Sequence, residues 1–342
     1  MAANTGAELT NRQEVPQGPL KANPWIKKIP PLGLLLFLVV LPLFQIANDG
    51  LNYWLHMLLY VFLYVIMSSS WNIIGGYAGY ISLGHNVFFA FGAYFAGMLF
   101  VYLRISPFLM APVAGILAML SGLAFGLIAL RTRGTAFIIS TIALVLLTIE
   151  VLDNWPLTGG TNGLPMSLIN LEGQYAKIPF YYYLLAIMIL TILTSYFIQH
   201  SKFGLGLRAI SQDETKAEVA GIPTRQYKIL AFGISGLFIG MAGAIWGSYI
   251  TYLRPSIFLT VALGTSIVLN AILGGKGTVS GPVIGTAIMI AVNEFVVAKL
   301  GASELNIVVT GMILILVLLF FPDGIVGSLR ARNHLPSFLD WD

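Results

Sequence analysis

Long apolar stretches without a charged residue dominate the pattern along the chain. A helix needs about 20 apolar residues to cross the hydrocarbon core of a bilayer. Strongly apolar stretches free of Asp, Glu, Lys and Arg occupy residues 29–48, 50–103, 105–130, 134–149, 178–201, 229–253, 255–275, 277–293 and 305–322. All but the second of these stretches fit one membrane-spanning helix each.

The stretch 50–103 is too long for a single span. Its middle segment, NIIGGYAGYISLGH at 72–85, places glycines and polar residues between two runs of aliphatic and aromatic residues. Clusters of glycine and polar residues between such runs mark turns and loops. We therefore predict two helices joined by a glycine-rich link, which brings the total to about ten transmembrane helices.

The positions of the basic residues support ten spans. Lysine and arginine are enriched in the cytoplasmic loops of membrane proteins. With two helices in 50–103, 13 basic residues beside the spans lie on the cytoplasmic side. The four on the outer side are Arg104, Lys177, Arg254 and Lys299. A third helix in 50–103 would reverse every later loop and remove this bias, so we predict that both termini are cytoplasmic.

Composition excludes most soluble classes of protein. Of the 342 residues, 57% are hydrophobic and 9% are charged, whereas soluble domains carry roughly 25% charged residues. A cytosolic enzyme, a disordered chain and a secreted disulfide scaffold are thereby excluded. The absence of cysteine also excludes thiolate-bound zinc and iron–sulfur clusters. The net charge of +4 includes no basic run that would indicate nucleic-acid binding. The sequence thus predicts an all-α, multi-pass membrane protein.

One membrane domain accounts for nearly the whole chain. We predict a flexible cytoplasmic tail at 1–28, a membrane domain at 29–329 and a cytoplasmic C-terminal tail at 330–342. Two polar segments are too long for tight turns, namely 153–177 on the outer side and 199–228 in the cytoplasm. No segment has the composition of an attached soluble module.

Residues with catalytic chemistry are sparse. The sequence LGGKGTVSG has the wrong glycine spacing for a phosphate-binding loop, and Gly277 follows the lysine where Ser or Thr would bind magnesium. We therefore predict no enzymatic activity, no metal site and no cofactor bound by this chain. His56, His85 and Glu294 lie in or near apolar runs, which leaves a stand-alone ion-coupled amino acid carrier as an alternative. Glu294 and Glu150 also fall near the outer ends of their helices, where contact with water accounts for their charge.

Glycines four residues apart mark close approaches between helices, because small residues let backbones pack tightly in lipid. These sets are Gly75/Gly79, Gly122/Gly126, Gly236/Gly240, Gly243/Gly247 and Gly277/Gly281/Gly285. The clusters at 75–84 and 274–285 also leave backbone groups free, which a bilayer tolerates only inside protein or along a water-filled cavity. Gly97, in apolar surroundings, is expected to face lipid. The residues predicted to line a pathway or to pack closely are Asn72, Gly75, Gly76, Gly79, Ser82, His85, Gly274 and Gly275.

The cytoplasmic segment 204–223 has the pattern of a short amphipathic helix. Leu207, Ile210, Ala217 and Ala220 recur at near-helical spacing on one face, and the charged residues face elsewhere. Gly221 can adopt the left-handed conformation that ends a helix, and Pro223 follows it. Such a helix either lies on the lipid surface or docks against a cytosolic partner, and the pattern fits both.

Several separated motifs resemble those of known transporters. The run GLGLRAISQDETKAEVAGI at 204–222 resembles the cytoplasmic loop of bacterial ABC-importer permeases. GYAGYISLGHNVFFAFGAY at 76–94 and LTGGTNGLP at 157–165 resemble the branched-chain amino acid permease family, specifically the larger of its two paired permease subunits. LAFGISGLFIGMAGAIWG at 230–247 and LGGKGTVSGPVIGTAI at 273–288 extend the likeness.

The resemblance implies a helix bundle of the ABC-importer permease type in the plasma (inner) membrane, as part of an ATP-driven importer of branched-chain amino acids. In such a system, this chain forms the translocation path together with a second permease subunit. Cytosolic ATPase subunits bind ATP and Mg²⁺, and an extracytoplasmic substrate-binding protein delivers the solute. The family also includes importers of urea and short-chain amides, which stay open as alternative substrates.

The resemblance also assigns a role to segment 204–222, which is the implied coupling helix in a cleft of the ATPase subunit. Its acidic residues are expected on the face offered to that partner. The coupling residues are Arg208, Asp213, Glu214, Ala217, Glu218 and Gly221. The matching residues of the outer loop are Thr158, Gly159, Gly160, Asn162 and Gly163.

Overall fold

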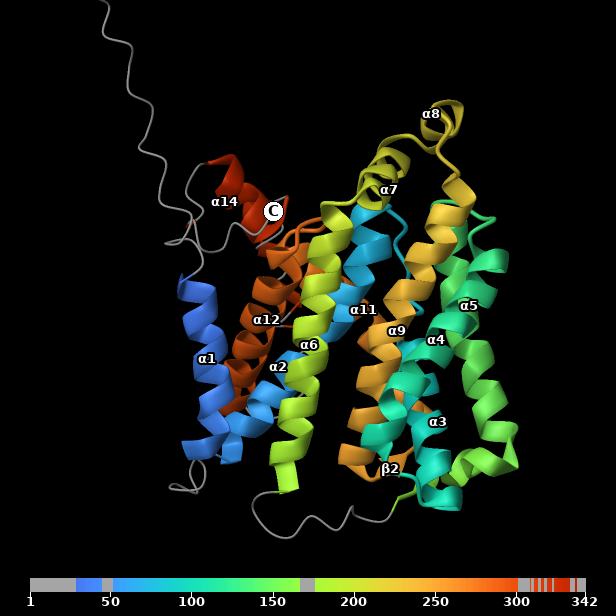
Figure 1. Ribbon diagram of the computed structural model, residues 1–342, viewed down its shortest axis with the longest axis vertical. Helices are drawn as coiled ribbons and strands as arrows, with labels where there is room; N and C mark the ends of the chain where they lie inside the picture. The colour runs from blue at the N-terminus through green and yellow to red at the C-terminus, as the bar shows by residue number, and fades with distance from the viewer. Residues whose placement is uncertain are drawn as a thin grey trace, which may run out of the picture.

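The chain folds as a bundle of long helices with two short strands at one end (Figure 1). The computed structural model describes residues 29–44, 52–166, 176–300 and 323–332, with isolated positions between 308 and 321 and at 336. Eight of the described helices are long and apolar enough to cross a membrane. The predicted all-α, polytopic membrane fold is therefore confirmed. The predicted tail at 1–28 lies outside the described residues.

The two helices predicted within 50–103 are both present. α2 (Asn52–Asn72) continues through a π-helical turn, η2 (Ile73–Tyr77), and a link at 78–85 leads to α3 (Asn86–Leu103). The later spans also coincide with the predicted stretches. They are α4 (Pro107–Ala129), α5 (Thr135–Asn154), α6 (Ile178–Gln199), α9 (Thr224–Ile250), α10 (Pro255–Phe258) joined to α11 (Val261–Gly274), and α12 (Ser280–Leu300).

The first and last predicted spans are not among these eight long spans. α1 (Ile29–Phe44) coincides with the first apolar stretch but has 16 residues, fewer than any of the eight long spans. Residues 305–322, the tenth predicted span, lie outside the described part of the chain except for isolated positions. The total of ten therefore stays a prediction.

Glycines bring α9 against its neighbours. α9 makes its most extensive contacts with α4 and α3. A Cβ atom on Gly92 of α3 would lie 2.0 Å from the carbonyl oxygen of Gly240, and one on Gly243 would lie 2.1 Å from that of Phe89. Only a residue without a side chain allows backbones to approach this closely. The predicted glycine packing is thus confirmed between α3 and α9.

Gly97 of α3 does not face lipid. The residue is buried, and a Cβ atom there would lie 2.4 Å from Cδ1 of Leu253. The expectation of a lipid-facing position is wrong, because apolar surroundings in the sequence describe a protein interior as well as a bilayer.

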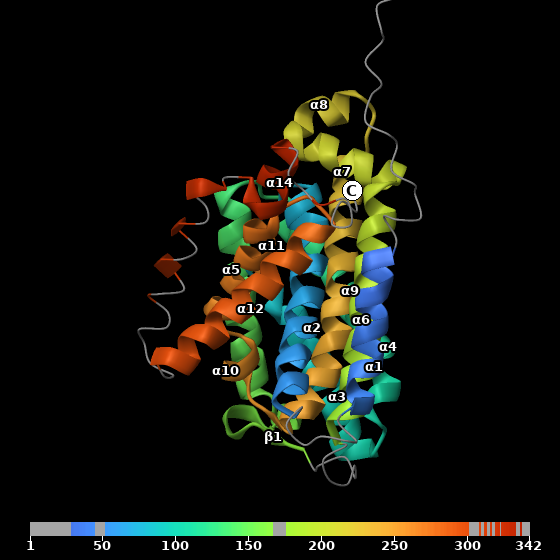
Figure 2. The ribbon, with the colours of Figure 1, turned by 90° about the vertical axis from the view of Figure 1, so that its left-hand side faces the viewer.

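The two ends of the bundle carry different structures. At one end, α7 (Lys202–Gln212) and α8 (Glu214–Val219) project beyond the spans, and α14 (Gly324–Ala331) lies at the same end (Figures 1 and 2). At the opposite end, β1 (Leu164–Pro165) pairs antiparallel with β2 (Tyr252–Leu253). We call these the helical end and the strand end. The charge pattern predicts that the helical end is cytoplasmic.

Candidate functional site

Two helices, not one, form the segment with the coupling motif. α7 begins after Ser201, whose hydroxyl accepts a hydrogen bond from the Gly204 amide at 3.1 Å. At Asp213 the backbone is extended, with φ −158° and ψ 105°, and the carboxylate accepts a hydrogen bond from the Lys216 amide at 3.1 Å. The prediction of one continuous helix over 204–222 is wrong, because an aspartate here caps the first turn of a new helix.

The far end of the helix pair has the predicted conformation. Gly221 adopts φ 86°, in the left-handed region. The Ile222 amide donates to the carbonyl oxygen of Ala217 at 3.0 Å, which satisfies a carbonyl at the end of α8. The direction in which the chain leaves α8 for α9 therefore depends on a glycine conformation.

The apolar face of the pair packs against the chain itself. Leu207, Ile210 and Ala217 are all buried. Tyr227 of α9 covers α7 so closely that a Cβ atom on Gly206 would lie 2.4 Å from its ring. Ala220, the fourth residue predicted on this face, is exposed, so the chain itself covers the face except at Ala220. Val219, which is 86% exposed, belongs to the surface that α8 presents outward.

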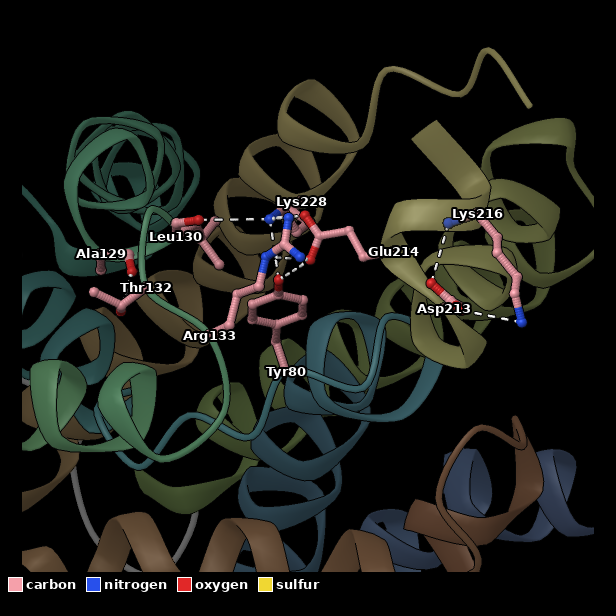
Figure 3. A network of polar contacts seen from close by, with 9 residues as sticks. All are labelled: Tyr80, Ala129, Leu130, Thr132, Arg133, Asp213, Glu214, Lys216 and Lys228. Atoms are coloured by element: carbon pink, nitrogen blue, oxygen red, sulfur yellow. Dashed lines mark hydrogen bonds and ion pairs between the residues drawn. The ribbon is translucent and has the colours of Figure 1, made fainter. Parts of the chain in front are cut away.

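Glu214 turns inward from the start of α8 and meets three residues from distant segments (Figure 3). Its Oε1 lies 2.5 Å from Nζ of Lys228, and its Oε2 lies 3.1 Å from Nε of Arg133. The hydroxyl of Tyr80 donates a hydrogen bond to Oε2. We call Tyr80, Arg133, Glu214 and Lys228 the Glu214 cluster. The expectation that Glu214 lies on the face offered to a partner is wrong, since its side chain is only 10% exposed.

Lys228, near the start of α9, has its ammonium group enclosed in the same cluster. The side chain is 4% exposed. Besides the carboxylate, Nζ donates to the Tyr80 hydroxyl at 3.0 Å and to the carbonyl oxygen of Leu130 at 3.5 Å. A buried charge is tolerated when it is both paired and hydrogen-bonded, and these contacts occupy all three ammonium protons.

The surroundings of Glu214 favour its ionised form. Burial raises the pKa of the Glu214 carboxyl, but the hydrogen bonds from Lys228 and Tyr80, together with the charges of Lys228 and Arg133, lower it by more, so that the net pKa lies below its ordinary value. Burial and the hydrogen bond to Glu214 raise the pKa of Tyr80, which therefore stays a neutral donor. The result is a closed network with one carboxylate between two cations.

The cluster ties α8 to three parts of the membrane domain. Tyr80 belongs to the link between η2 and α3, Arg133 to the connection between α4 and α5, and Lys228 to α9. A cavity of about 230 Å³ lies beside it, with Gly79, Phe137 and Ser211 in its lining. A displacement of α8 therefore acts directly on these three segments.

Sequence reasoning did not find Tyr80, Arg133 or Lys228. The available signal was Lys228 itself, which directly precedes the apolar stretch 229–253. A lysine buried in that position requires an anionic partner. Nothing in the sequence indicates that this partner is Glu214.

The remaining coupling residues lie around the outside of the pair. Asp213 is 39% exposed and lies 3.2 Å from Nζ of Lys216. The pKa of its carboxyl is lowered, chiefly by the hydrogen bond from the Lys216 amide. Arg208 lies over the ring of Tyr77, at 6.0 Å from its centroid, and Glu218 is exposed. The structure thus separates the partly exposed Asp213, paired with Lys216, from the inward Glu214 (Figure 3).

Asn72 joins the two glycine clusters. Its Nδ2 donates to the carbonyl oxygen of Thr278 and its Oδ1 accepts from the Gly277 amide, both at 2.8 Å. A Cβ atom on Gly76 would lie 2.7 Å from the Gly277 nitrogen, and one on Gly274 would lie 1.7 Å from the carbonyl oxygen of Gly281. These contacts are close packing, and a role in the pathway stays a prediction.

The other predicted residues of these clusters also make contacts within the chain. Gly75 lies against the ring of Trp71, and Gly275 has a positive φ of 131°. Gly79, with φ 76°, lies beside Ser211 of α7, so a Cβ atom there would be 2.7 Å from the serine hydroxyl. The glycine-rich link thus touches the helix pair as well as the Glu214 cluster.

His85 is held as a neutral imidazole. It is buried, and its Nδ1 and Nε2 lie 2.9 Å from the hydroxyls of Ser82 and Ser235. Ser235 donates its own proton to the carbonyl oxygen of Phe232 at 2.7 Å, so it accepts from Nε2, and Nδ1 accepts from Ser82. Both ring nitrogens have hydroxyl partners and neither contacts an acid, which fits a structural role.

The other candidates for ion coupling lie apart from His85. Nδ1 of His56 is 2.7 Å from the hydroxyl of Tyr249. Glu294 accepts a hydrogen bond from Tyr53 at 2.9 Å in exposed surroundings, and Glu150 is exposed. In the described part of the chain, neither glutamate is enclosed by protein, and their contact with water at the outer helix ends stays a prediction.

The outer-loop motif folds into a fixed turn structure at the strand end. Two 3₁₀ turns, η3 (Pro156–Thr158) and η4 (Gly160–Asn162), follow α5. The Thr158 hydroxyl lies 2.6 Å from the carbonyl oxygens of Leu152 and Trp155. The three motif glycines have positive φ angles, at Gly159, Gly160 and Gly163.

The same motif is fastened to the connection between α9 and α10. The hydroxyl of Tyr252 donates to the carbonyl oxygen of Asn162 at 2.6 Å, and the Met166 amide donates to that of Thr251 at 2.8 Å. The strand pair sets Leu164 opposite Leu253. Residues 167–175 of the predicted outer segment lie outside the described residues.

Comparisons with known proteins give a consistent result. The family described as "Branched-chain amino acid transport system / permease component" matches residues 53–318. The high-affinity branched-chain amino acid transport system permease protein LivM of Escherichia coli is 26% identical over 302 residues, which cover 80% of this chain and 70% of LivM.

Two further relatives show the breadth of the similarity. The permease protein LivH of Salmonella typhimurium, from a high-affinity branched-chain amino acid transport system, is 33% identical over 143 residues, or 42% of this chain and 44% of LivH. The ribose import permease protein RbsC of Haemophilus influenzae is 26% identical over 206 residues, or 58% of this chain and 62% of RbsC. No solved structure matches the chain significantly.

Proposed function

Because the chain belongs to the branched-chain amino acid transport permease family, we propose that it is the permease subunit of an ATP-driven importer of branched-chain amino acids. The substrate follows the names of LivM and LivH, which the chain resembles over 80% and 42% of its length. RbsC is named for ribose, so the substrate is the part of the proposal that most needs a direct test. The protein acts in the plasma membrane with both termini in the cytoplasm.

The proposal includes three kinds of partner. The similarity to both LivM and LivH supports pairing with a second permease subunit, because both are permease proteins of high-affinity branched-chain amino acid transport systems. ATPase subunits bind ATP and Mg²⁺ at the helical end, and this chain binds no cofactor of its own. A substrate-binding protein delivers the amino acid at the strand end.

The Glu214 cluster is the observation that carries the coupling role. Glu214 connects α8 to Lys228, Arg133 and Tyr80 through charged and neutral hydrogen bonds. A helix fixed in this way cannot move without moving the segments to which it is bonded. The exposed side of α8, including Lys216, Glu218 and Val219, is then the surface that receives the ATPase subunit.

Transport by the reconstituted complex tests the function. The chain, the second permease and the ATPase subunits are placed in proteoliposomes with the binding protein outside, and uptake of labelled L-leucine is measured with and without enclosed ATP. We expect uptake that requires ATP. Uptake by this chain alone under an ion gradient would instead establish the carrier alternative. Competition by urea or acetamide, but not by valine, would assign the amide substrate.

Co-purification tests the coupling surface. Val219→Asp places a charge on the exposed side of α8 and should reduce recovery of the ATPase subunits with the tagged permease. Leu157→Asp is the matched control, because Leu157 is also an exposed apolar residue but lies at the strand end. Equal recovery of the ATPase with both variants would exclude this face of α8 as the docking surface.

A further inference from the structure

A cavity of about 280 Å³ opens at the strand end, on the opposite side of the bundle from the Glu214 cluster. Its wall comes from the end of α5, from η4, and from α10 with the residues just before and after it. The lining includes Ile149, Asp153, Thr161, Arg254, Ser256 and Leu259. Ligand sites range from about 300 to 1,000 Å³, so this cavity suits a ligand the size of a single amino acid.

Two opposite charges line the cavity without neutralising each other. Asp153 comes from the last turn of α5, and Arg254 immediately precedes α10. Among the described residues, neither side chain forms an ion pair within 4.0 Å. Asp153 is half-buried and Arg254 is exposed, so both charged groups are accessible from the cavity and available to a charged ligand.

The cavity also lies at a break in a spanning helix. α10 ends at Phe258 and α11 begins at Val261, with the Thr260 hydroxyl accepting a hydrogen bond from the Leu263 amide at 3.1 Å. Interrupted helices in membrane proteins are tolerated where the free backbone is buried in protein or lines a cavity. Leu259 lies in this interruption and also in the cavity wall. The break and the charges therefore belong to one site.

We propose that this cavity binds the free substrate as a zwitterion, an inference that rests on the proposed function. Arg254 receives the α-carboxylate, Asp153 receives the α-ammonium group, and Ile149 with Leu259 forms the apolar wall for the side chain. Guanidinium and carboxylate groups form charge-assisted hydrogen bonds with the two charged groups of an amino acid. A zwitterion with an apolar side chain is the ligand that complements all three features at once.

The surrounding turns hold the two charges in place. Thr158 closes the turn that follows α5, and the β1–β2 pair joins this loop to the chain just before Arg254. Because both walls are fastened to each other, Asp153 and Arg254 keep their relative position before the ligand arrives. Preorganisation of this kind lowers the entropy cost of binding. The permease itself then recognises the amino acid after the binding protein releases it.

Direct binding to the complex tests the site. The two permeases with their ATPase subunits are placed in nanodiscs without the binding protein, and binding of tritiated L-leucine is measured at equilibrium. Unlabelled L-leucine should compete. L-Leucinamide, which lacks the carboxylate, and 4-methylpentanoate, which lacks the ammonium group, should compete at least about tenfold more weakly, because each loses one charge-assisted contact.

Variants locate the binding to this cavity. Arg254→Gln and Asp153→Asn should each weaken L-leucine binding by about tenfold or more, since each removes one charged contact. Arg104→Gln and Glu150→Gln are the matched controls. They change the same charges at the strand end, but neither residue lines the cavity, so leucine binding should be unchanged.

Two outcomes would overturn the inference and leave the proposed function standing. The first is a complex that imports leucine in proteoliposomes but binds none in the absence of the binding protein. The second is normal leucine binding by Arg254→Gln and Asp153→Asn with weaker association of the binding protein, which would make the two charges a docking surface. Failure of leucine uptake by the wild-type complex would overturn the proposed function, and this inference with it.

Discussion

The two ends of the bundle differ in whether their charged residues form ion pairs. At the helical end, Glu214 lies between Lys228 and Arg133 and is 10% exposed. At the strand end, Asp153 and Arg254 line one cavity but form no ion pair in the described structure. Oppositely charged side chains that pair with each other hold their segments together. Charged side chains without an ion-pair partner can instead bind the charged groups of a ligand. The difference matches the two proposed roles, which are coupling at the helical end and substrate binding at the strand end.

The largest expected effect is the loss of one partner in the closed cluster. Glu214→Gln leaves the 4% exposed ammonium of Lys228 without its carboxylate. Breaking a buried ion pair in this way costs about 3–5 kcal/mol. We expect a lower thermal midpoint of the purified permease and a loss of leucine uptake. The thermal midpoint is compared with that of Glu218→Gln, which changes an exposed glutamate of the same helix.

A double variant separates the effect of the cluster on stability from its effect on transport. Glu214→Met combined with Lys228→Met replaces both members of the buried pair by apolar residues, which is often neutral for stability, and Arg133, 57% exposed, keeps its charge in water. We expect the thermal midpoint to recover while transport stays low, because α8 is no longer fastened to α9. Equal thermal midpoints of Glu214→Gln and Glu218→Gln would show that the Glu214 cluster stabilises the fold no more than an exposed carboxylate does.

The second effect compares two glycines with nearly the same backbone conformation. Gly221 at the helical end has φ 86° and nothing within 4 Å of a Cβ position, whereas Gly159 at the strand end has φ 81° and the Gly163 carbonyl oxygen at 2.2 Å. A non-glycine residue in this conformation costs of order 1–3 kcal/mol. Gly221→Ala should show this cost alone in the thermal midpoint, and Gly159→Ala should lose more because of the clash. Equal losses would mean that the outer turn can shift to make room.

Sequence alone predicts the membrane-spanning helices well, because lipid imposes the simple rule that a span is apolar over about 20 residues. The apolar stretches and the glycine-rich break at 72–85 locate α2 to α6 and α9 to α12, and the positive φ of Gly221 follows from its place after a helix. Gly97 shows the limit of that rule. Its apolar neighbours indicate a nonpolar environment, but they do not distinguish lipid from the Leu253 side chain.

The candidate sites are less predictable because they join distant segments. Helical periodicity places Glu214 on the charged face of one helix, but the break at Asp213 starts a new helix whose first residue turns inward. Tyr80 and Glu214 are 134 residues apart, and no periodic pattern relates them. Arg254 is placed on the outer side by the charge bias, but its position across a cavity from Asp153 depends on the β1–β2 pair.

The third effect is a dependence of stability on pH at the helical end. The folded pKa of Glu214 is lowered from its ordinary value of 4.5. Its ionised form therefore stabilises the fold fully above the unfolded value, and this contribution is lost as the pH falls through the lower folded pKa. We expect the difference in thermal midpoint between wild type and Glu214→Gln to be constant near neutrality and to shrink in acid below pH 4.5. A difference that is unchanged in acid would show that the carboxylate is not ionised in the cluster.

The smallest expected effect on stability is at Asp153 and Arg254. It is also the sharpest test of the difference in ion pairing between the two ends. Arg254→Gln and Asp153→Asn remove side chains that form no ion pair in the described structure, so no buried charge is left behind. Substitutions away from such networks usually change stability by about 0.5 kcal/mol or less. The thermal midpoint of each variant, measured without amino acid, should therefore stay close to the wild-type value even though binding of leucine is weakened. A loss as large as that of Glu214→Gln would show that Asp153 and Arg254 neutralise each other in the folded protein. The two ends would then use charge in the same way, and the cavity would have no open charges to offer a zwitterion.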